Sequence, residues 1–197
     1  QQLTSHYEVK GFTDWSELEA EGLFLEGTGS MVIDHDNQII YACLSQRTHY
    51  SALEKFAHYN RYKAIAFHAT DVNGTPVYHT NVMLTIGSDF AVICNDCFAD
   101  ELKWIAVSQL LRTTGHRIVT ISQQQVKAFA GNMLQVKNNT GESFLVMSQT
   151  AFDSLSTKQR MLLEISCTLL PVKIPTIETL GGGSARCMMA EIFLKKK

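Results

Sequence analysis

The feature of this sequence that most constrains its fold is an internal repeat of about 50 residues. A small or polar residue followed by an apolar run occurs four times, and we take Ser30, Asn81, Asn132 and Cys187 as the equivalent positions. The intervals between them are 51, 51 and 55 residues. A fixed period of this size is typical of proteins built from one supersecondary unit, which must stack on its neighbours to bury its apolar face.

Each interval contains the same order of expected elements, namely two strands, a helix and a third strand. Turn residues between β-branched and aromatic runs predict the hairpins, and apolar residues spaced by three and four predict the helices. Gly115 and Pro171 are suitable helix ends. The expected strands are 30–34, 38–44, 63–67, 82–86, 90–94, 117–121, 133–136, 143–147 and 172–177, and the expected helices are 50–59, 100–113 and 157–169.

The expected fold is therefore an α/β propeller of ββαβ units, whose apolar faces are covered by stacking about an axis. We expect one domain over residues 1–197, with units at about 24–75, 76–127 and 128–180 and the first strand of a further unit within 181–197. The first strands of all units would begin around one central cavity. Because a closed ring has no reason to stop there, about two more units are expected to precede this sequence.

The strongest candidate for a functional site is the segment from Gly181 to Cys187, which reads Gly-Gly-Gly-Ser-Ala-Arg-Cys. Glycine accepts positive φ and lets other groups approach the backbone closely. A thiol on such a turn is accessible, whereas a cysteine that only packs usually lies within a strand. We therefore predict that Cys187 opens an apolar strand and acts as the nucleophile of a cysteine hydrolase.

Two other residues with catalytic chemistry lie near equivalent strand starts, Glu26 and His79. A cysteine attacks as its thiolate, which a nearby imidazole favours, and a carboxylate can orient that imidazole or hold a cationic substrate. A single histidine at a strand start is more often structural, and a glutamate in a glycine-rich turn is often only solvated. Three such residues at matching repeat positions favour the catalytic interpretation.

The composition excludes several other classes of function. The net charge is −2, and lysine and arginine are dispersed except for the solvated Lys195–Lys197, so neither nucleic acid nor membrane is an expected partner. Five cysteines without framework spacing indicate a reducing, cytoplasmic location, and we interpret Cys94 and Cys97 as partly buried thiols. The histidines lack metal-ligand spacing, so no metal is expected. The glycine tract leads into a strand and lacks a phosphate-loop lysine, and no cofactor is expected.

Four segments resemble the guanidine-modifying superfamily, the penteins, which are five-bladed ββαβ propellers. The superfamily includes arginine deiminases, dimethylarginine dimethylaminohydrolases and amidinotransferases. The resemblance covers nearly the whole chain in the family's order, and the branch it suggests is that of bacterial amidinotransferase-like proteins proposed to hydrolyse citrulline. The segments are Leu25-Glu26-Gly27, Leu44-Ser45-Gln46-Arg47-Thr48, Tyr78-His79-Thr80-Asn81 and Gly181–Cys187.

The resemblance implies a role for each matching residue. Cys187 would attack the guanidino or ureido carbon, and His79 would protonate the departing amine and then activate water. Glu26 would bind the substrate nitrogens. Arg47 would pair with the α-carboxylate, although a surface salt bridge is an equally good interpretation. Ser184 and Asn132 would line or shape the cavity.

Two departures from the family pattern favour a neutral substrate. Arginine deiminases have Gly-Gly-Asp after the glutamate, where this chain has Gly27-Thr28-Gly29, and they have His-Xaa-Asp where this chain ends in Asn81. A guanidinium is costly to desolvate without paired carboxylates, whereas an asparagine offers both a donor and an acceptor. We therefore expect citrulline, hydrolysed to ornithine, ammonia and carbon dioxide.

Other functions stay open at this point. Within enzymes they are arginine or dimethylarginine hydrolysis and amidino transfer, and outside them a non-catalytic binding protein of the same fold. The expected partner is a small amino-acid substrate, and a homo-oligomer stays open as a further possibility.

Overall fold

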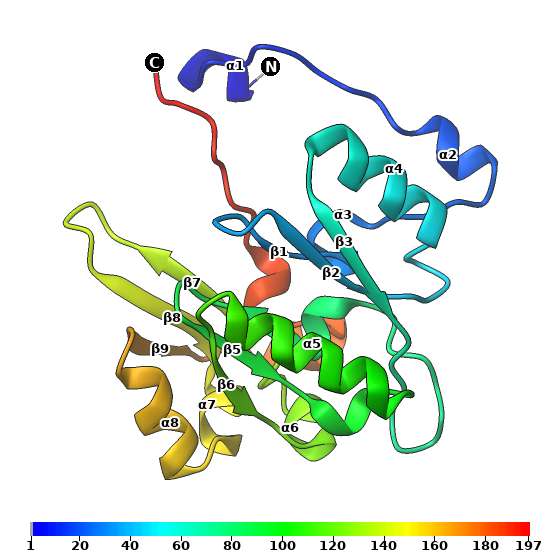
Figure 1. Ribbon diagram of the computed structural model, residues 1–197. Coiled ribbons are helices and arrows are strands. Elements are labelled where there is room, and N and C mark those ends of the chain that lie inside the picture. Colours follow the sequence, from blue (N-terminus) through cyan, green and yellow to red (C-terminus); the bar gives the residue numbers. More distant parts are fainter. Residues whose placement is uncertain (1) are drawn as a thin grey trace.

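A computed structural model describes residues 2–197 and contains three separate three-stranded sheets, none of which closes into a barrel (Figure 1). In each sheet the first two strands form an antiparallel hairpin, and the third returns parallel to the second after a helix. The strands are β1 (Val32–Asp34), β2 (Ile39–Cys43), β3 (Lys63–Phe67), β4 (Leu84–Ile86), β5 (Phe90–Ile93), β6 (Arg117–Thr120), β7 (Leu134–Lys137), β8 (Ser143–Ser148) and β9 (Thr168–Val172). The expected ββαβ order is thus present three times.

One crossover helix in each unit packs against the third strand of its own sheet, as Figure 1 shows for α4, α5 and α8. These helices are α4 (Tyr50–Asn60), α5 (Glu101–Thr113) and α8 (Thr157–Glu164). The remaining helical segments are α1 (Gln2–His6), α2 (Glu17–Ala20), α3 (Gly27–Ser30), η1 (Thr80–Val82), η2 (Asn95–Cys97), α6 (Gln123–Lys127), α7 (Gln149–Ser154), η3 (Ile177–Gly181) and η4 (Ala185–Met188).

The crossover helices begin and end where their sequences provide caps. The Asp100 side chain accepts a hydrogen bond from the backbone of Leu102 at the start of α5, and Ser156 forms a capping box with Gln159 at the start of α8. Arg61 ends α4 in the left-handed conformation. These local signals fix the crossovers that bring each third strand back beside the second.

The core is built on the central strands. All residues of β2 and β5 are buried, because each strand has a partner on both sides and is covered on both faces. Buried residues of β2, β5 and β8 belong to one continuous hydrophobic cluster, which joins the three units. A small second cluster, centred on Ile40 and Leu53, holds α4 against the first sheet.

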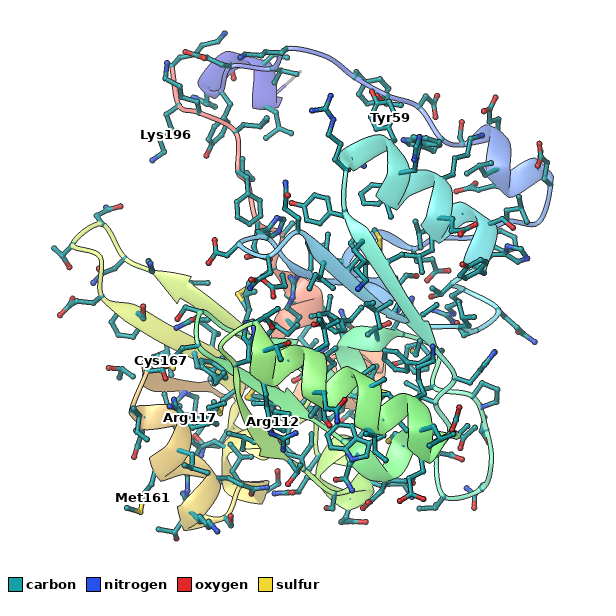
Figure 2. The ribbon with its side chains drawn as sticks, in the orientation of Figure 1. Tyr59, Arg112, Arg117, Met161, Cys167 and Lys196 are labelled. Atoms are coloured by element: carbon teal, nitrogen blue, oxygen red, sulfur yellow. The ribbon has the colours of Figure 1, made fainter. Side chains whose placement is uncertain are left out.

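The second and third units are also joined by polar contacts at their outer edge. Arg117 of β6 donates to the hydroxyl of Ser166 at 2.6 Å and lies 3.4 Å from a carboxylate oxygen of Asp89. Figure 2 labels Arg117 and Cys167, the residue that follows Ser166 in the chain. The boundary between these two units is therefore both packed and hydrogen-bonded.

The expectation for the third unit was wrong in its last helix and strand. We expected a helix over 157–169 and a strand over 172–177, but α8 ends at Glu164 and β9 begins at Thr168. The parallel register with β8 explains the difference, because Phe144 pairs with Thr168 and Ser148 pairs with Val172. Pro171 is tolerated inside β9 because this is an edge strand, where one side needs no backbone donor.

The strand expected to begin at Cys187 is also absent from the described chain. Residues 185–188 form the short 3-10 helix η4, which packs against β8, and no strand follows it within 181–197. A strand needs a hydrogen-bonded neighbour, and this segment makes only the isolated bridge between Tyr7 and Lys196 near the chain ends (Figure 1). Figure 2 labels Lys196 at that position.

The second and third sheets meet so closely that one position between them must be glycine. A Cβ atom on Gly131 would lie 2.2 Å from the carbonyl oxygen of Val82, and the hydroxyl of Thr85 donates to the carbonyl of Gly131 at 2.7 Å. Backbone therefore packs on backbone immediately before Asn132. This contact sets where the third unit begins relative to the second.

We predict that Gly131→Ala lowers the free energy of unfolding by about 1–3 kcal/mol or more, because a methyl group cannot be accommodated against backbone. Urea titration followed by circular dichroism measures the change. Gly11→Ala is the matched control, since a Cβ atom there meets no atom within 4 Å. Equal stability of the two variants would contradict the close packing.

Candidate functional site

Cys187 lies on η4, directly after a turn that the glycines make possible. Gly182 adopts φ 65° at the end of η3, and the amide of Cys187 donates to the carbonyl of Ser184 at 3.1 Å. A Cβ atom on Gly183 would lie 3.2 Å from the Cβ of Cys187. Cys187 is the one exposed cysteine, and the other four are buried. The glycine segment therefore presents this thiol to solvent.

Asn132 is the hydrogen-bond partner of that thiol. Its Nδ2 lies 3.3 Å and its Oδ1 lies 3.5 Å from the Sγ of Cys187. The same Nδ2 donates to the backbone carbonyl of Asn81 at 3.0 Å. Three of the four repeat-equivalent positions are thus connected through one buried amide.

A second group of predicted residues is formed by Glu26, His79 and Arg47. The Nε2 of His79 lies 2.6 Å from the Oε2 of Glu26, and a guanidinium nitrogen of Arg47 lies 3.5 Å from the same oxygen. The glutamate and arginine side chains are about half exposed, whereas the imidazole is mostly buried. The carboxylate therefore orients the imidazole on one side and is neutralised by Arg47 on the other.

The local fold explains why these residues meet. Ser30, at the end of α3, accepts from the amide of Glu26 and donates to the carbonyl of Arg47, both at 2.8 Å. The hydroxyl of Thr80, next to His79, donates to the carbonyl of Ser30 at 2.5 Å. The backbones that carry all three side chains are therefore fixed to Ser30.

Tyr78 connects the two groups, and our sequence interpretation did not give it a role. Its ring lies 5.2 Å from the Arg47 guanidinium and 4.9 Å from the imidazole of His79, and its hydroxyl lies 3.4 Å from the carbonyl oxygen of Gly182. Burial raises the pKa of the Tyr78 phenol, the nearby Cys187 thiolate raises it further, and Arg47 lowers it. The sequence signal that could have identified Tyr78 is its position directly before His79.

A cavity of about 300 Å³ opens at Cys187. Its lining is mainly apolar, with Val77, Val82, Val126 and Phe129, and polar groups come from Tyr78, Asn132, Ser184, Asp71 and Lys127. The volume and the mixed lining suit a small molecule with a polar reacting end. No sequence signal pointed to Asp71 or Lys127, which come from a loop and from the end of α6.

A larger cavity of about 390 Å³ lies between the first strands of the three sheets and contains none of the residues predicted to be catalytic. Volume alone would favour this larger cavity as the binding site. We place the candidate site in the smaller cavity because that cavity contains the accessible thiol.

The remaining predicted residues differ in their surroundings. Ser184 lines the cavity, but its hydroxyl donates to the carboxylate of Glu178 at 3.1 Å. Asn81 is buried, its Nδ2 donates to the carbonyl of Thr28 at 3.1 Å, and its Oδ1 has no partner among the described residues. No hydrogen bond joins His79 to Cys187 in the described chain, so the predicted catalytic residues form two groups with Tyr78 between them.

Residues 2–197 contain no cluster of three or more potential metal-ligating side chains, and no helix among them has the length and apolarity to cross a membrane.

A family model described as N,N dimethylarginine dimethylhydrolase, eukaryotic, matches residues 1–194. The chain belongs to this family. Its name is that of a hydrolase acting on a guanidino C–N bond, which places the chain among the arginine deiminase-like and dimethylargininase-like penteins. No curated protein sequence matches the chain.

Solved structures of the superfamily share the fold. Apo ArgZ, an arginine dihydrolase from the ornithine-ammonia cycle in cyanobacteria, superimposes with a TM-score of 0.67 at 15% identity, over 88% of this chain and 26% of that one. A mutant of AgrE in complex with L-arginine superimposes with a TM-score of 0.67 at 15% identity, over 84% of this chain and 23% of that one. A dimethylarginine dimethylaminohydrolase adduct with 4-chloro-2-hydroxymethylpyridine superimposes with a TM-score of 0.53 at 11% identity, over 83% of this chain and 58% of that one. The chain spans about a quarter of the length of the first two.

We predict that Gly29→Ala displaces the His79 ring, because a Cβ atom there would lie 2.8 Å from two ring atoms. In long-range ¹H–¹⁵N spectra, the imidazole signal assigned with His79→Gln should shift while the signals of the other six histidines stay in place. Gly11→Ala again serves as the control. An unchanged His79 signal in Gly29→Ala would contradict the described contact.

Proposed function

We propose that this chain carries a cysteine-dependent hydrolase site for the C–N bond of a ureido or guanidino amino acid, with citrulline as its substrate and ornithine as its product. The observation that carries the proposal is the accessible thiol of Cys187, hydrogen-bonded to Asn132 at the cavity beside Tyr78 and His79. The family supports hydrolysis, and the substrate and the covalent mechanism are our inference.

The proposed reaction begins with attack of the Cys187 thiolate on the ureido carbon. The tetrahedral adduct collapses as the bond between the ureido carbon and the side-chain nitrogen of citrulline breaks. His79 donates a proton to that nitrogen, and ornithine leaves. The enzyme then holds an S-carbamoyl group on Cys187. Water attacks this group after giving a proton to His79, and the released carbamate decomposes to ammonia and carbon dioxide, so that one citrulline and one water are consumed.

The geometry supports separate tasks for the two groups of residues. Glu26 accepts from the imidazole at 2.6 Å and so fixes the orientation of the ring that is proposed to protonate the leaving amine. Arg47, held by Glu26 and stacked on Tyr78, is the proposed partner of the substrate α-carboxylate, and rearrangement from its present ion pair would free it for that role. Asn81 and Ser184 are proposed to shape the substrate site.

A neutral substrate agrees with the charges around the thiol. Asp71 is the one carboxylate among the described residues of the cavity lining, and Lys127 faces the same space. Backbone hydrogen bonds from Thr75 and Asn73 lower the pKa of Asp71, and Lys127 lowers it further. Within this cavity lining a guanidinium would therefore meet a cation and a single, already bonded carboxylate, which favours an uncharged ureido group.

Arginine or dimethylarginine hydrolysis is the second candidate, and the family description is the observation that favours it. Amidino transfer and a non-catalytic binding role are further alternatives. Release of ammonia without an amine acceptor separates hydrolysis from transfer, and any turnover excludes a purely binding role.

We predict that the longest expressible protein containing these residues releases ammonia from citrulline faster than from arginine or dimethylarginine, and that Cys187→Ala abolishes this release. An enzyme-coupled ammonia assay with ornithine quantified by mass spectrometry measures both products. Met188→Ala, an exposed neighbour on the same short helix, is the matched control and should stay active. Faster release from arginine or dimethylarginine would contradict citrulline, and full activity in Cys187→Ala would contradict the nucleophile.

We predict that Asn81→Asp increases the ratio of kcat/KM for arginine to that for citrulline by about tenfold, because a carboxylate near the site favours a cationic group. Steady-state kinetics on both substrates measure the ratio, and thermal unfolding confirms that the variant folds. Asn139→Asp, in an exposed turn, makes the same charge change elsewhere and should leave the ratio unaltered. A folded Asn81→Asp with the wild-type ratio would show that Asn81 does not set specificity.

A further inference from the structure

Asn132 is buried, with 2% of its surface exposed, yet its amide is directed at the exposed cysteine. Its Nδ2 is shared between two acceptors, the carbonyl of Asn81 at 3.0 Å and the Sγ of Cys187 at 3.3 Å. Its Oδ1 lies 3.5 Å from the same sulfur. Both ends of the side chain therefore face the thiol, and neither is free to solvent.

The hydrogen bond to Asn81 determines which end of the Asn132 side-chain amide is the nitrogen and which is the oxygen. A backbone carbonyl can only accept, so the nitrogen of Asn132 must face Asn81 and cannot exchange places with the oxygen. One N–H bond is used by that carbonyl, and the other is left for the sulfur. The orientation of the amide relative to Cys187 is therefore set by the second unit's backbone.

This arrangement can serve both protonation states of the sulfur. A neutral thiol donates to Oδ1, and a thiolate accepts from the N–H of Nδ2, which is the stronger, charge-assisted bond. We propose that Asn132 is a positioning residue for Cys187, holding its sulfur toward the cavity and stabilising its thiolate by a hydrogen bond. The consequence for catalysis rests on the proposed function, whereas the effect on the thiolate does not.

Other charged and titratable groups near the sulfur do not provide this bond. The phenol of Tyr78 is directed at the carbonyl of Gly182, and the carboxylate of Glu178 is used by Ser184 and Thr150. β8, against which η4 packs, has no ionisable residue. The remaining groups are Asp71 and Lys127 on the cavity lining, His79 paired with Glu26, and Arg186 on η4, which donates to Met189 and Glu191.

Alkylation of Cys187 by iodoacetamide tests the proposal without any substrate. The rate is measured from pH 5 to 10 by mass spectrometry of the peptide containing Cys187, so reaction at the four buried cysteines does not interfere. We expect Asn132→Asp to raise the pH of half-maximal reactivity by about one unit, slowing alkylation near neutral pH about tenfold, because a carboxylate replaces the donor. Asn132→Ala should raise it by a smaller amount.

Asn139→Asp is the control for charge and should match the wild type. Circular dichroism checks folding of each variant, and if Asn132→Asp does not fold, Asn132→Ala decides the outcome. A midpoint equal to wild type, with the rate changed by the same factor at every pH, would show a merely structural role and overturn the proposal. A shifted midpoint in a protein that hydrolyses none of the three candidate substrates would uphold it and reject the proposed function.

Discussion

The buried hydroxyl of Thr80 is the interaction on which the rest of the site depends. It donates to the carbonyl of Ser30 and accepts from the amide of Cys43, so a single side chain joins η1 to both α3 and β2. A buried hydroxyl without partners would be costly, and here its two shortest hydrogen bonds go to the first unit's backbone. Because Thr80 follows His79 directly, any shift of this contact would separate the imidazole from Glu26.

The junction between the second and third units uses the same kind of contact. The hydroxyl of Thr85 donates to the carbonyl of Gly131 and accepts from the amide of Met133, and the amide of Asn132 reaches back to the carbonyl of Asn81. In both junctions a polar side chain of one unit satisfies the backbone of the neighbouring unit, close to where the first strands begin. Buried hydrogen bonds of this kind hold the two backbones in one relative position as well as stabilising the contact. The candidate site residues lie at or next to these junctions, where hydrogen bonds fix the backbone of one unit against another.

The sequence was sufficient for elements that local signals define. The period located three sheets and three crossover helices, since hairpin turns, caps and apolar spacing act within a unit. The period did not predict the limits of β9, because these are set by the register with β8. It also predicted a strand at Cys187 that is absent, because such a strand would have needed a neighbouring strand to pair with. Of the four equivalent positions, Asn81, Asn132 and Cys187 are connected by hydrogen bonds, whereas Ser30 is bonded to Glu26, Arg47 and Thr80. Tyr78 lies between the two groups because of its neighbours in space, which periodicity does not report.

The separation of the two groups of residues has a chemical consequence. An imidazole bonded directly to a thiol would set the thiol's ionisation and would be engaged when the leaving amine needs its proton. Here His79 is bonded to Glu26, and the sulfur is bonded to Asn132. In the mechanism we propose, the neutral amide of Asn132 would stabilise the sulfur, and the imidazole of His79 would protonate the amine on the far side of a substrate bound beside Tyr78. Stabilising the nucleophile and protonating the leaving group would then be tasks of different unit junctions, and a substrate that spans both junctions would bring the two groups to the same carbon.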